Sequence, residues 1–355
     1  MRLGPRRALA IVVSAALAAS VAAIERSDKT ASAVAPSKPH AAAQRPAADD
    51  SPTATPTTPP PATTSPATRS AIPKARKPRA VATAPAPRKS ATPTKRPAAS
   101  SGKALLGMSA PLQFWNKRVS EVGSGLQARR LFFTSFDASL SKAQDTCNAG
   151  LYPVMSFKTG GYSWAQVASG DADAALQALH TRLAALTCAG FAAVHHEPAK
   201  DGAAADWAAM QVHALPILGG PAGGNIKVGV IGNGWWWSAN KKGLGDAEIA
   251  AYITPGVKAV SDVIAGDTYQ MTSSAEDAAT KIARMTAWAR RVGGVKALGI
   301  GEFNAPTAGG ITSAVKAIAA DPLFAWGCLW NADLNTVSVL SGDRLTAFRK
   351  ALAAW

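Results

Sequence analysis

The sequence is poor in acidic residues, with 22 Asp and Glu against 38 Lys and Arg. The imbalance is confined to one end, because residues 1–103 contain 17 of the basic residues and 4 of the acidic ones. The same segment contains no Phe, Tyr or Trp, so it lacks the aromatic rings on which proteins stack unpaired bases. We therefore expect no nucleic-acid partner. We interpret the basic segment as a solvated tail that contacts the anionic polymers or lipids of a cell envelope.

Cysteine is also rare, since the chain has three, Cys147, Cys188 and Cys328. Their spacing matches no metal-binding motif. No other cluster of ligand residues suggests a metal or an organic cofactor, and we predict neither. The odd number leaves at least one thiol free unless two chains pair. The sequence does not select the partners of a disulfide, and we expect each cysteine to act as a small buried apolar residue.

Long apolar runs are absent except at the start, where residues 8–23 are all apolar or small. The first seven residues contain three arginines, and Val21-Ala22-Ala23 places small residues where a signal peptidase cleaves. We predict that residues 1–23 are a secretory signal peptide; an uncleaved signal anchor is the alternative. The protein is therefore expected to be secreted or associated with the cell surface or cell wall.

Large apolar residues are nearly missing from residues 24–103, which consist mainly of Pro, Ala, Thr, Ser, Lys and Arg. Without them the segment has no core to offset the entropy that is lost on ordering. Its many prolines favour an extended, semi-rigid chain. We predict a disordered low-complexity linker, or stalk, that holds the following domain away from its point of attachment.

Residues 104–355 differ in character, because short apolar runs alternate there with alanine-rich stretches of helical periodicity. The runs predict strands at 104–109, 129–133, 152–157, 191–196, 226–231, 260–264 with 266–269, 297–301 and 325–330. Helical patterns between them include 171–186, 203–215, 275–291, 311–320 and 342–354. Eight strand–helix units in about 250 residues are typical of an α/β fold of the (β/α)8 TIM barrel class. No glycine-rich phosphate loop follows the first strand, which argues against a doubly wound nucleotide-binding sheet. We expect a monomer.

Two glutamates stand where a TIM barrel carries its chemistry, at the carboxyl ends of strands. Glu197 follows the fourth predicted strand and Glu302 follows the seventh. A carboxylate that emerges from an apolar strand is costly unless it is paired or functional. Cleavage of a glycosidic bond needs two such groups, one to protonate the departing oxygen and one to attack or stabilise the sugar. The two glutamates therefore predict a glycoside hydrolase, and carboxyl groups about 5–5.5 Å apart would make it a retaining one.

Short motifs around the glutamates resemble those of clan A glycoside hydrolases, nearest the family 26 β-mannanase group. The His196-Glu197 order is similar to the acid/base motif of family 26, and the Ile-Gly-Glu-Phe run at 300–303 resembles the nucleophile strand of the clan. The resemblance implies that Glu197 is the acid/base and Glu302 the nucleophile, oriented by His196 and Tyr269. Tyr269 would donate a hydrogen bond to the nucleophile.

The same resemblance places Trp330 beneath the sugar at the cleavage point. It implies a polysaccharide substrate, β-linked and cut internally, with mannan as one candidate. The sequence departs from family 26 after the acid/base, where Pro198-Ala199-Lys200 replaces the usual Met or Asn and aromatic residues.

A run of three tryptophans, Trp235–Trp237, follows the fifth predicted strand. Flat apolar rings suit the CH faces of sugars, so we predict that part of this run binds substrate; packing of the loop over the barrel is the alternative. Arg130 is predicted to reach the site, and an ion pair at the rim of the barrel is an equal alternative for it. The predicted substrate-binding residues are Trp330, Trp235, Trp236, Asn233, Arg130 and Trp164.

An alternative to the enzyme is a non-catalytic barrel that binds a glycan at the end of the stalk. A third hypothesis is an adhesin-like protein in which the basic stalk itself binds. Two carboxylates that face one cleft favour the enzyme, whereas a glutamate turned outward favours the glycan-binding barrel. Strict alternation along the fourth strand would put His195 on the face of Glu197, and His196 would need an irregularity to turn inward.

Overall fold

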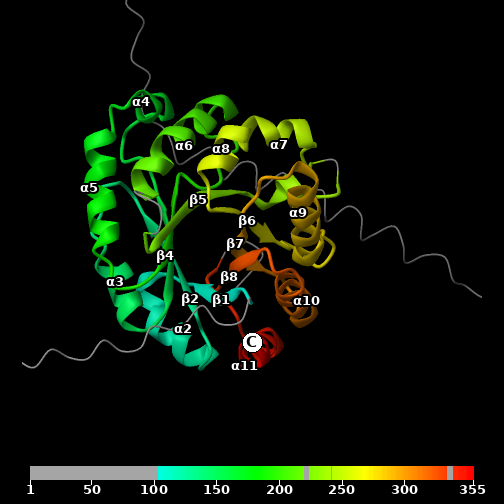
Figure 1. The fold of residues 1–355 in the computed structure, drawn as a ribbon. Helices are drawn as coiled ribbons and strands as arrows, with labels where there is room; N and C mark the ends of the chain where they lie inside the picture. The colour runs from blue at the N-terminus through cyan, green and yellow to red at the C-terminus, as the bar shows by residue number, and fades with distance from the viewer. Residues whose placement is uncertain (1–102, 220–223, 241, 334–338) are drawn as a thin grey trace, which may run out of the picture. The chain divides into compact units, whose positions relative to one another are not determined.

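The computed structural model describes residues 103–219, 224–240, 242–333 and 339–355. In this part of the chain eight parallel strands pair in sequence order, and the last pairs with the first to close a barrel. Helices surround the barrel (Figure 1). The predicted (β/α)8 TIM barrel is confirmed. The predicted signal peptide at 1–23 and all but the last residue of the predicted linker lie outside the described residues.

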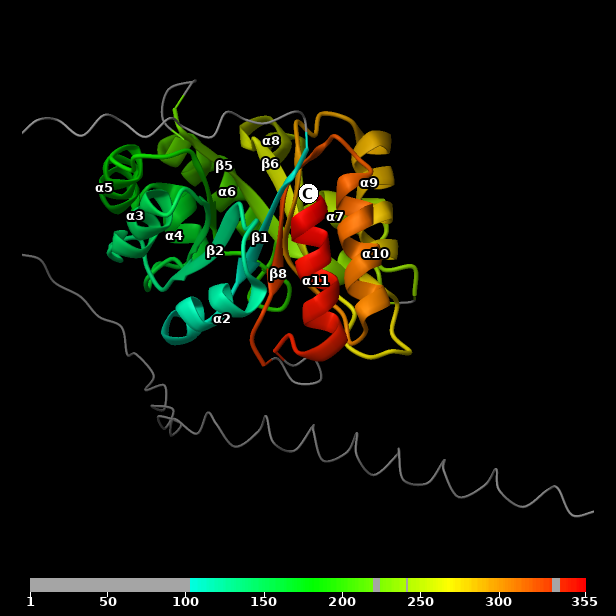
Figure 2. The ribbon, with the colours of Figure 1, turned by 90° about the horizontal axis from the view of Figure 1, so that it is seen from below.

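The strands are β1 (Leu105–Ser109), β2 (Ala128–Phe133), β3 (Tyr152–Phe157), β4 (Gly190–Val194), β5 (Ile226–Asn233), β6 (Val263–Tyr269), β7 (Leu298–Asn304) and β8 (Phe324–Trp330). The α-helices are α2 (Trp115–Val122), α3 (Ser141–Asn148), α4 (Trp164–Ser169), α5 (Asp173–Ala184), α6 (Ala204–Gly219), α7 (Asp246–Tyr252), α8 (Pro255–Val260), α9 (Ala278–Val292), α10 (Ala308–Ala319) and α11 (Gly342–Ala354). Two 3-10 helices, η1 (Leu112–Phe114) and η2 (Gly234–Trp237), follow β1 and β5. Figure 2 shows α9, α10 and α11 side by side along one flank of the barrel. None of the described helices combines the length and the apolarity needed to cross a membrane.

Several strand boundaries differ from the prediction. β4 ends at Val194 instead of residue 196, and β7 continues to Asn304. The sixth strand begins at Val263, because the residues before it form α8. That helix begins at Pro255 and is capped by the Thr254 hydroxyl, which accepts a hydrogen bond from the Val257 N–H.

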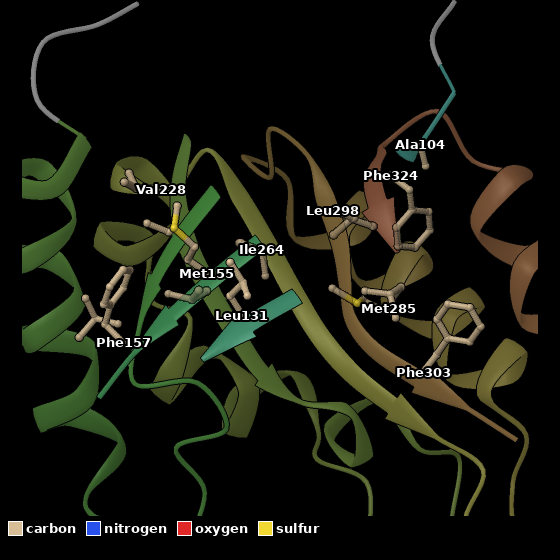
Figure 3. Close-up of a cluster of buried hydrophobic side chains, with 14 of the residues drawn as sticks. Ala104, Leu131, Met155, Phe157, Val228, Ile264, Met285, Leu298, Phe303 and Phe324 are labelled. Carbon is tan, nitrogen blue, oxygen red and sulfur yellow. The ribbon is translucent and has the colours of Figure 1, made fainter. Parts of the chain in front are cut away.

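The apolar side chains form two layers, one inside the barrel and one between the barrel and the helices. Phe191 and Trp326 fill the interior, where their ring centres lie 5.0 Å apart. Gly299 makes room for this ring, because a Cβ atom there would lie 2.6 Å from Trp326. The outer layer is larger and includes residues from most strands and helices (Figure 3). The residues labelled in Figure 3 are Ala104, Leu131, Met155, Phe157, Val228, Ile264, Met285, Leu298, Phe303 and Phe324.

Strand β7 contains an irregularity that decides where Glu302 points. Its register with β6 skips Gly301, so that Glu302 lies opposite Asp267. Ile300 and Phe303 both belong to the outer layer, although an odd number of steps separates them. Strict alternation from Ile300 would have turned Glu302 toward the helices. The bulge turns it into the barrel instead, as bulges at barrel rims commonly do.

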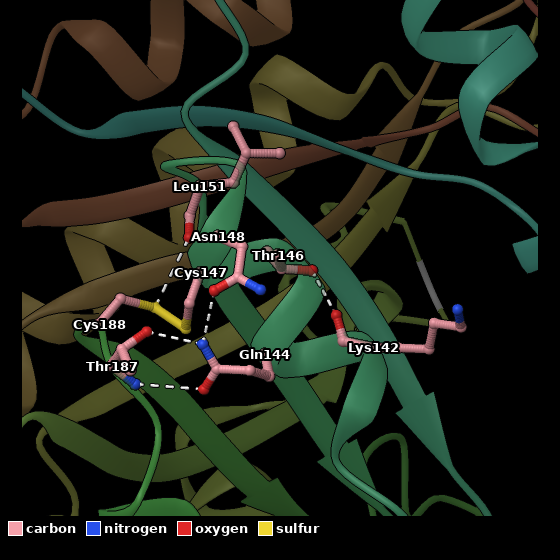
Figure 4. The surroundings of a disulfide bond; sticks show 8 residues. All are labelled: Lys142, Gln144, Thr146, Cys147, Asn148, Leu151, Thr187 and Cys188. Atoms are coloured by element: carbon pink, nitrogen blue, oxygen red, sulfur yellow. Dashed lines mark hydrogen bonds between the residues drawn. A yellow bond between two sulfur atoms is a disulfide. The ribbon is translucent and has the colours of Figure 1, made fainter. Parts of the chain in front are cut away.

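A disulfide joins Cys147 at the end of α3 to Cys188 before β4, with Cα atoms 5.3 Å apart (Figure 4). The Gln144 amide group joins the same two segments, because its Nε2 donates to Thr187 Oγ1 over 2.7 Å. The expectation that each cysteine is only a small buried residue is therefore wrong for two of the three. It is right for Cys328, which is free and buried inside the barrel.

Candidate active site

Polar side chains meet at the carboxyl ends of the strands, above the apolar interior of the barrel. Each lies at or near the carboxyl end of its strand, or in the loop that follows the strand. These residues are Arg130 on β2, Glu197 after β4, Asn233 on β5, Asp267 and Tyr269 on β6, and Glu302 on β7. We call this group the mouth cluster. Both predicted catalytic glutamates belong to it.

Glu302 is held by two neighbours that stabilise a negative charge. The Tyr269 hydroxyl donates a hydrogen bond to Glu302 Oε2, as the resemblance implied, and Arg130 Nε lies 3.8 Å from Oε1. Arg130 is fully buried, and its guanidinium carbon lies 4.3 Å from the centre of the Phe132 ring. Burial raises the pKa of Glu302, while the Arg130 charge and the Tyr269 hydrogen bond oppose that rise. Both contacts favour the ionised form of the Glu302 carboxyl group.

Glu197 sits at a backbone position that few side chains adopt, with a φ of 53°. Its N–H donates to the Ile231 carbonyl over 2.9 Å, which ties the residue to β5. Asn233 strengthens this connection, because its Nδ2 donates to Glu197 Oε1 over 3.5 Å and its Oδ1 accepts from the Ala199 N–H over 3.0 Å. Burial, and secondly the charge of Glu302, raise the pKa of Glu197 to about 7. The two glutamates of one mouth therefore differ in their surroundings, because Glu302 has a cation and a hydroxyl donor beside it and Glu197 has an amide donor.

His195 does not share the face of Glu197, so the prediction from strict alternation is wrong. β4 ends before it, and its φ of 48° is left-handed, which breaks the alternation. Its Nε2 lies 2.8 Å from Asp201 Oδ2, and its ring meets the edge of Trp164 on α4 at 4.9 Å. Helix α6 fixes the same turn, because Trp207 Nε1 donates to the His195 carbonyl over 2.9 Å. His195 thus belongs to the loop that supports Glu197.

His196 turns toward the mouth, and the left-handed turn at His195 supplies the irregularity that this requires. Its ring centre lies 5.4 Å from that of Phe132. Burial, with the nearby Arg130 charge, lowers the pKa of His196 to about 2. The imidazole is therefore neutral, and it can orient a neighbour but carries no positive charge.

Asp267 is a member of the mouth cluster that the sequence reasoning missed. It is 3% exposed and lies next to Asn233 and Glu302 in the sheet register. The signal was present in the sequence, because Asp267 stands two residues before Tyr269 and so shares its face on a regular strand. Burial raises the pKa of Asp267 well above its ordinary value, and the charges of Glu302 and Glu197 add to the rise.

Donor atoms of His196, Glu197 and Asp267 all lie within 4.8 Å of one another, which is the one such group among the residues the structure describes. A metal ion here would have to displace the proton of Glu197. Both Asp267 oxygens are also enclosed by protein. We therefore treat the three residues as interacting side chains and not as a metal centre.

Two aromatic rings border the mouth on the side of β8 and β2. Trp330 is the last residue of β8 and is half-buried, and its place beneath the sugar stays a prediction. Phe132 at the end of β2 is 43% exposed, and its ring centre lies 6.1 Å from that of Trp330. The sequence reasoning did not select Phe132, although this residue stands two positions after Arg130 and so shares its face on a regular strand.

Two predicted substrate-binding tryptophans are placed elsewhere. Trp236 is fully buried and stacks on Tyr252 of α7 with ring centres 4.6 Å apart, so it is core and not a sugar platform. Trp164 is 8% exposed and packs against His195, which leaves it no face for a ligand. Trp235 is half-buried and packs against the outer apolar layer. The alternative of a loop packed over the barrel is thus correct for most of this run.

Comparison with known proteins supports the fold. No protein-family model and no curated protein sequence matches the chain. Among solved structures, the GH5_18 protein of Bifidobacterium longum matches with a TM-score of 0.51 at 11% identity, over 72% of this chain and 80% of that one. The barrel has the fold of the clan A glycoside hydrolases. The resemblance that the short motifs indicated is confirmed at the level of the fold.

Two further solved structures are similar to parts of the chain. The family 26 domain of a Prevotella bryantii endo-beta-mannanase/endo-beta-glucanase has a TM-score of 0.47 at 12% identity, over 72% of this chain and 90% of that one. A fungal beta-1,4-galactanase has a TM-score of 0.48 at 12% identity, over 69% of this chain and 93% of that one. The nearest family stays a prediction.

Proposed function

We propose that the barrel is a retaining glycoside hydrolase in which Glu197 is the acid/base and Glu302 the nucleophile. The observation that carries this proposal is the difference between two carboxyl groups at one mouth. Tyr269 and Arg130 stabilise the ionised form of Glu302, whereas burial keeps a proton on Glu197 up to about pH 7. One group is suited to attack and the other to donate a proton.

In the first half-reaction a Glu302 oxygen attacks the anomeric carbon while the bond from that carbon to the leaving oxygen breaks. The proton of Glu197 passes to the leaving oxygen, so that the departing sugar leaves as an alcohol. Glu302 becomes a glycosyl ester, and Glu197 becomes a carboxylate. Loss of the charge on Glu302 lowers the pKa of Glu197, because that charge had raised it.

In the second half-reaction Glu197 removes a proton from a water molecule as the water oxygen attacks the same carbon. The ester bond breaks, and Glu302 leaves as a carboxylate that Tyr269 and Arg130 stabilise. Each step inverts the anomeric centre, so the product retains its configuration.

The proposed substrate is a β-linked polysaccharide, with mannan among the candidates, and cleavage is internal. Trp330 and Phe132 offer the apolar rings that pack against sugar CH faces, and both lie beside the mouth. The proposal requires neither a metal nor an organic cofactor, and the working unit is the monomer.

Export is part of the proposal and rests on the sequence of residues 1–103. A secretory signal would place the protein outside the membrane, and the Pro-rich basic stalk would tether the barrel near an anionic envelope. Limited proteolysis of the full chain is expected to leave a resistant fragment that begins near Lys103. A protected fragment within residues 30–95 would contradict the disordered stalk.

The experiment is a screen of the full chain against a panel of polysaccharides, with reducing ends as the readout, followed by two variants. Glu302→Ala should stop formation of the glycosyl-enzyme, and azide should attack the substrate directly to give an inverted product. Glu197→Ala should still react with substrates whose leaving group needs no proton, and azide should then give a retained product. Wild-type activity in both variants would show that the assignment is wrong.

A non-catalytic glycan-binding barrel is the second candidate. The enclosed position of Glu302, which is 6% exposed, favours it, because a nucleophile must reach the sugar. If the protein cleaves no member of the panel but binds one glycan in a titration, this second function replaces the first.

A further inference from the structure

Asp267 is a third carboxyl group at the mouth that the proposed mechanism does not use. It lies directly between the strands of Asn233 and Glu302 in the sheet. One of its oxygens also lies within 4.8 Å of a Glu197 carboxyl oxygen. Asp267 therefore borders both catalytic glutamates.

The carboxyl groups of Asp267 and Glu302 both have oxygens that lack a hydrogen-bond donor in the described part of the chain. Neither oxygen of Asp267 has a hydrogen-bond donor among the described residues, and Glu302 Oε1 is also buried without one. The Glu302 N–H lies near enough to Asp267 to favour its ionised form slightly, but it does not reach hydrogen-bond geometry. Two neighbouring side chains thus each have a buried oxygen that no donor satisfies. A proton on one Asp267 oxygen would give Glu302 Oε1 a donor and would leave the other Asp267 oxygen as an uncharged carbonyl.

The backbone is shaped for the Asp267 carboxyl group. A Cβ atom on Gly301 would lie 2.2 Å from Asp267 Oδ1, so the carboxyl group occupies the space of a missing side chain. Gly301 is also the residue that the β6–β7 register skips. The bulge that turns Glu302 inward is therefore the same feature that accommodates Asp267.

The number of charges around Asp267 indicates whether this carboxyl group carries a proton. Arg130 is the only cation among the described groups that act on Asp267, and it faces three carboxyl groups. A buried carboxylate without a donor or water is costly. Glu302 has the hydrogen bond and the ion pair, so one negative charge belongs there. The ionisable groups around Asp267 are Glu197 after β4, His196 beside it, Arg130 on β2, Tyr269 on β6, Glu302 on β7 and Cys328 on β8.

We propose that Asp267 is a positioning residue that carries a proton in the resting site and donates its O–H to Glu302 Oε1. This proposal rests on the proposed function, because it assigns Asp267 a task toward the nucleophile. The neutral acid adds no charge to the mouth. Its hydrogen bond stabilises Glu302 as a carboxylate, and this matters most in the second half-reaction, where Glu302 leaves the sugar.

Infrared spectroscopy of the full chain tests the proton without using activity. A protonated carboxyl group has its own carbonyl stretch, separate from that of a carboxylate. We expect this band to persist in the wild type above the pH at which Glu197 ionises, and to be absent in Asp267→Asn. Asp321→Asn is the matched control, because Asp321 is also buried but pairs with Arg290 over 2.7 Å; its loss should leave the band unchanged. A band that survives in Asp267→Asn, or is missing in the wild type, overturns the proposal.

Kinetics test the positioning role with an aryl glycoside whose first half-reaction is fast. Asp267→Ala should lower kcat by about 10- to 100-fold, the effect of one lost hydrogen bond to a charged group. KM should fall in parallel, because the glycosyl-enzyme accumulates when only the second step slows. Asp267→Asn keeps a neutral N–H donor and should recover most of the rate. A fall in kcat with a raised KM, or no recovery in the Asn variant, would assign Asp267 a structural role.

The two proposals fail separately. If the protein cleaves nothing, the infrared band still decides whether Asp267 carries a proton. If the glutamate variants behave as proposed but Asp267→Asn leaves the band intact, only the role of Asp267 is lost.

Discussion

The carboxyl group of Asp267 occupies the space that a side chain at Gly301 would need, since a Cβ atom there would lie 2.2 Å from Asp267 Oδ1. The two residues face each other across β6 and β7, at the place where the register skips one residue. The direction of the neighbouring Glu302 depends on this arrangement. Gly301 thus has a role in the site although it has no side chain.

Gly301→Ala is expected to disturb the mouth more than the fold. The added methyl group must push Asp267 or the β7 backbone, at a cost of about 1–3 kcal/mol in the free energy of unfolding, and kcat should fall because Glu302 moves. Urea unfolding and turnover on the best substrate measure both. Gly309→Ala is the control, because the nearest atom to its Cβ is 3.9 Å away on α10; it should keep both stability and turnover. Unchanged turnover in Gly301→Ala would contradict the role of the bulge.

Tyr269→Phe removes the hydroxyl that donates to Glu302 and keeps the ring. That hydrogen bond lowers the pKa of Glu302, so its loss raises the pKa and moves the acidic limb of the kcat/KM profile to higher pH. We expect kcat to fall about 10- to 100-fold. Tyr252→Phe, on a ring that stacks against Trp236, should change neither quantity. An unshifted acidic limb would remove Tyr269 from the site.

The pKa of about 7 for Glu197 predicts the alkaline limb of the same profile. Glu197 must carry a proton in the first half-reaction, so kcat/KM should fall as the pH rises through about 7. Glu197→Gln should abolish this limb when the leaving group needs no proton. The measurement is kcat/KM against pH for wild type and variant. A limb that persists in the variant belongs to another group.

Trp330 and Trp236 should respond to truncation in opposite ways. Trp236→Ala empties a fully buried site and should lower the free energy of unfolding by roughly 3–5 kcal/mol, with turnover per folded molecule nearly unchanged. Trp330→Ala should reduce kcat/KM strongly and alter stability little, because its ring is only half-buried at the mouth. Thermal unfolding and turnover distinguish the two. The reverse pattern would show that Trp330 is core and Trp236 is not.

Replacing Cys147 and Cys188 together by Ser should lower the free energy of unfolding by roughly 2–4 kcal/mol, since their bond closes a long loop. A reducing agent should lower the wild-type unfolding temperature toward that of the double variant. It should not affect the double variant itself. Equal unfolding temperatures for wild type and double variant under oxidising conditions would contradict the bond.

Local patterns in the sequence are enough to predict the class of the fold and to select Glu197 and Glu302 as the candidate catalytic pair. Alternating apolar strands and helical stretches are local patterns, and each is readable within a short window. In a TIM barrel they also define which ends carry the site. The resemblance to clan A glycoside hydrolases, and not a local pattern, selects Tyr269 and Trp330, which are the last residues of β6 and β8.

The directions of the side chains at the mouth depend on how the strands pair and where they end. Glu302 faces inward because a bulge at Gly301 changes the alternation of β7, and His195 faces away because β4 ends one residue before it. The burial of Trp236, the choice of Cys147 and Cys188 as partners, and the position of Asp267 between two glutamates depend on segments far apart in the sequence. Such contacts are set by how elements pack, and packing is a property of the whole barrel that no local pattern encodes.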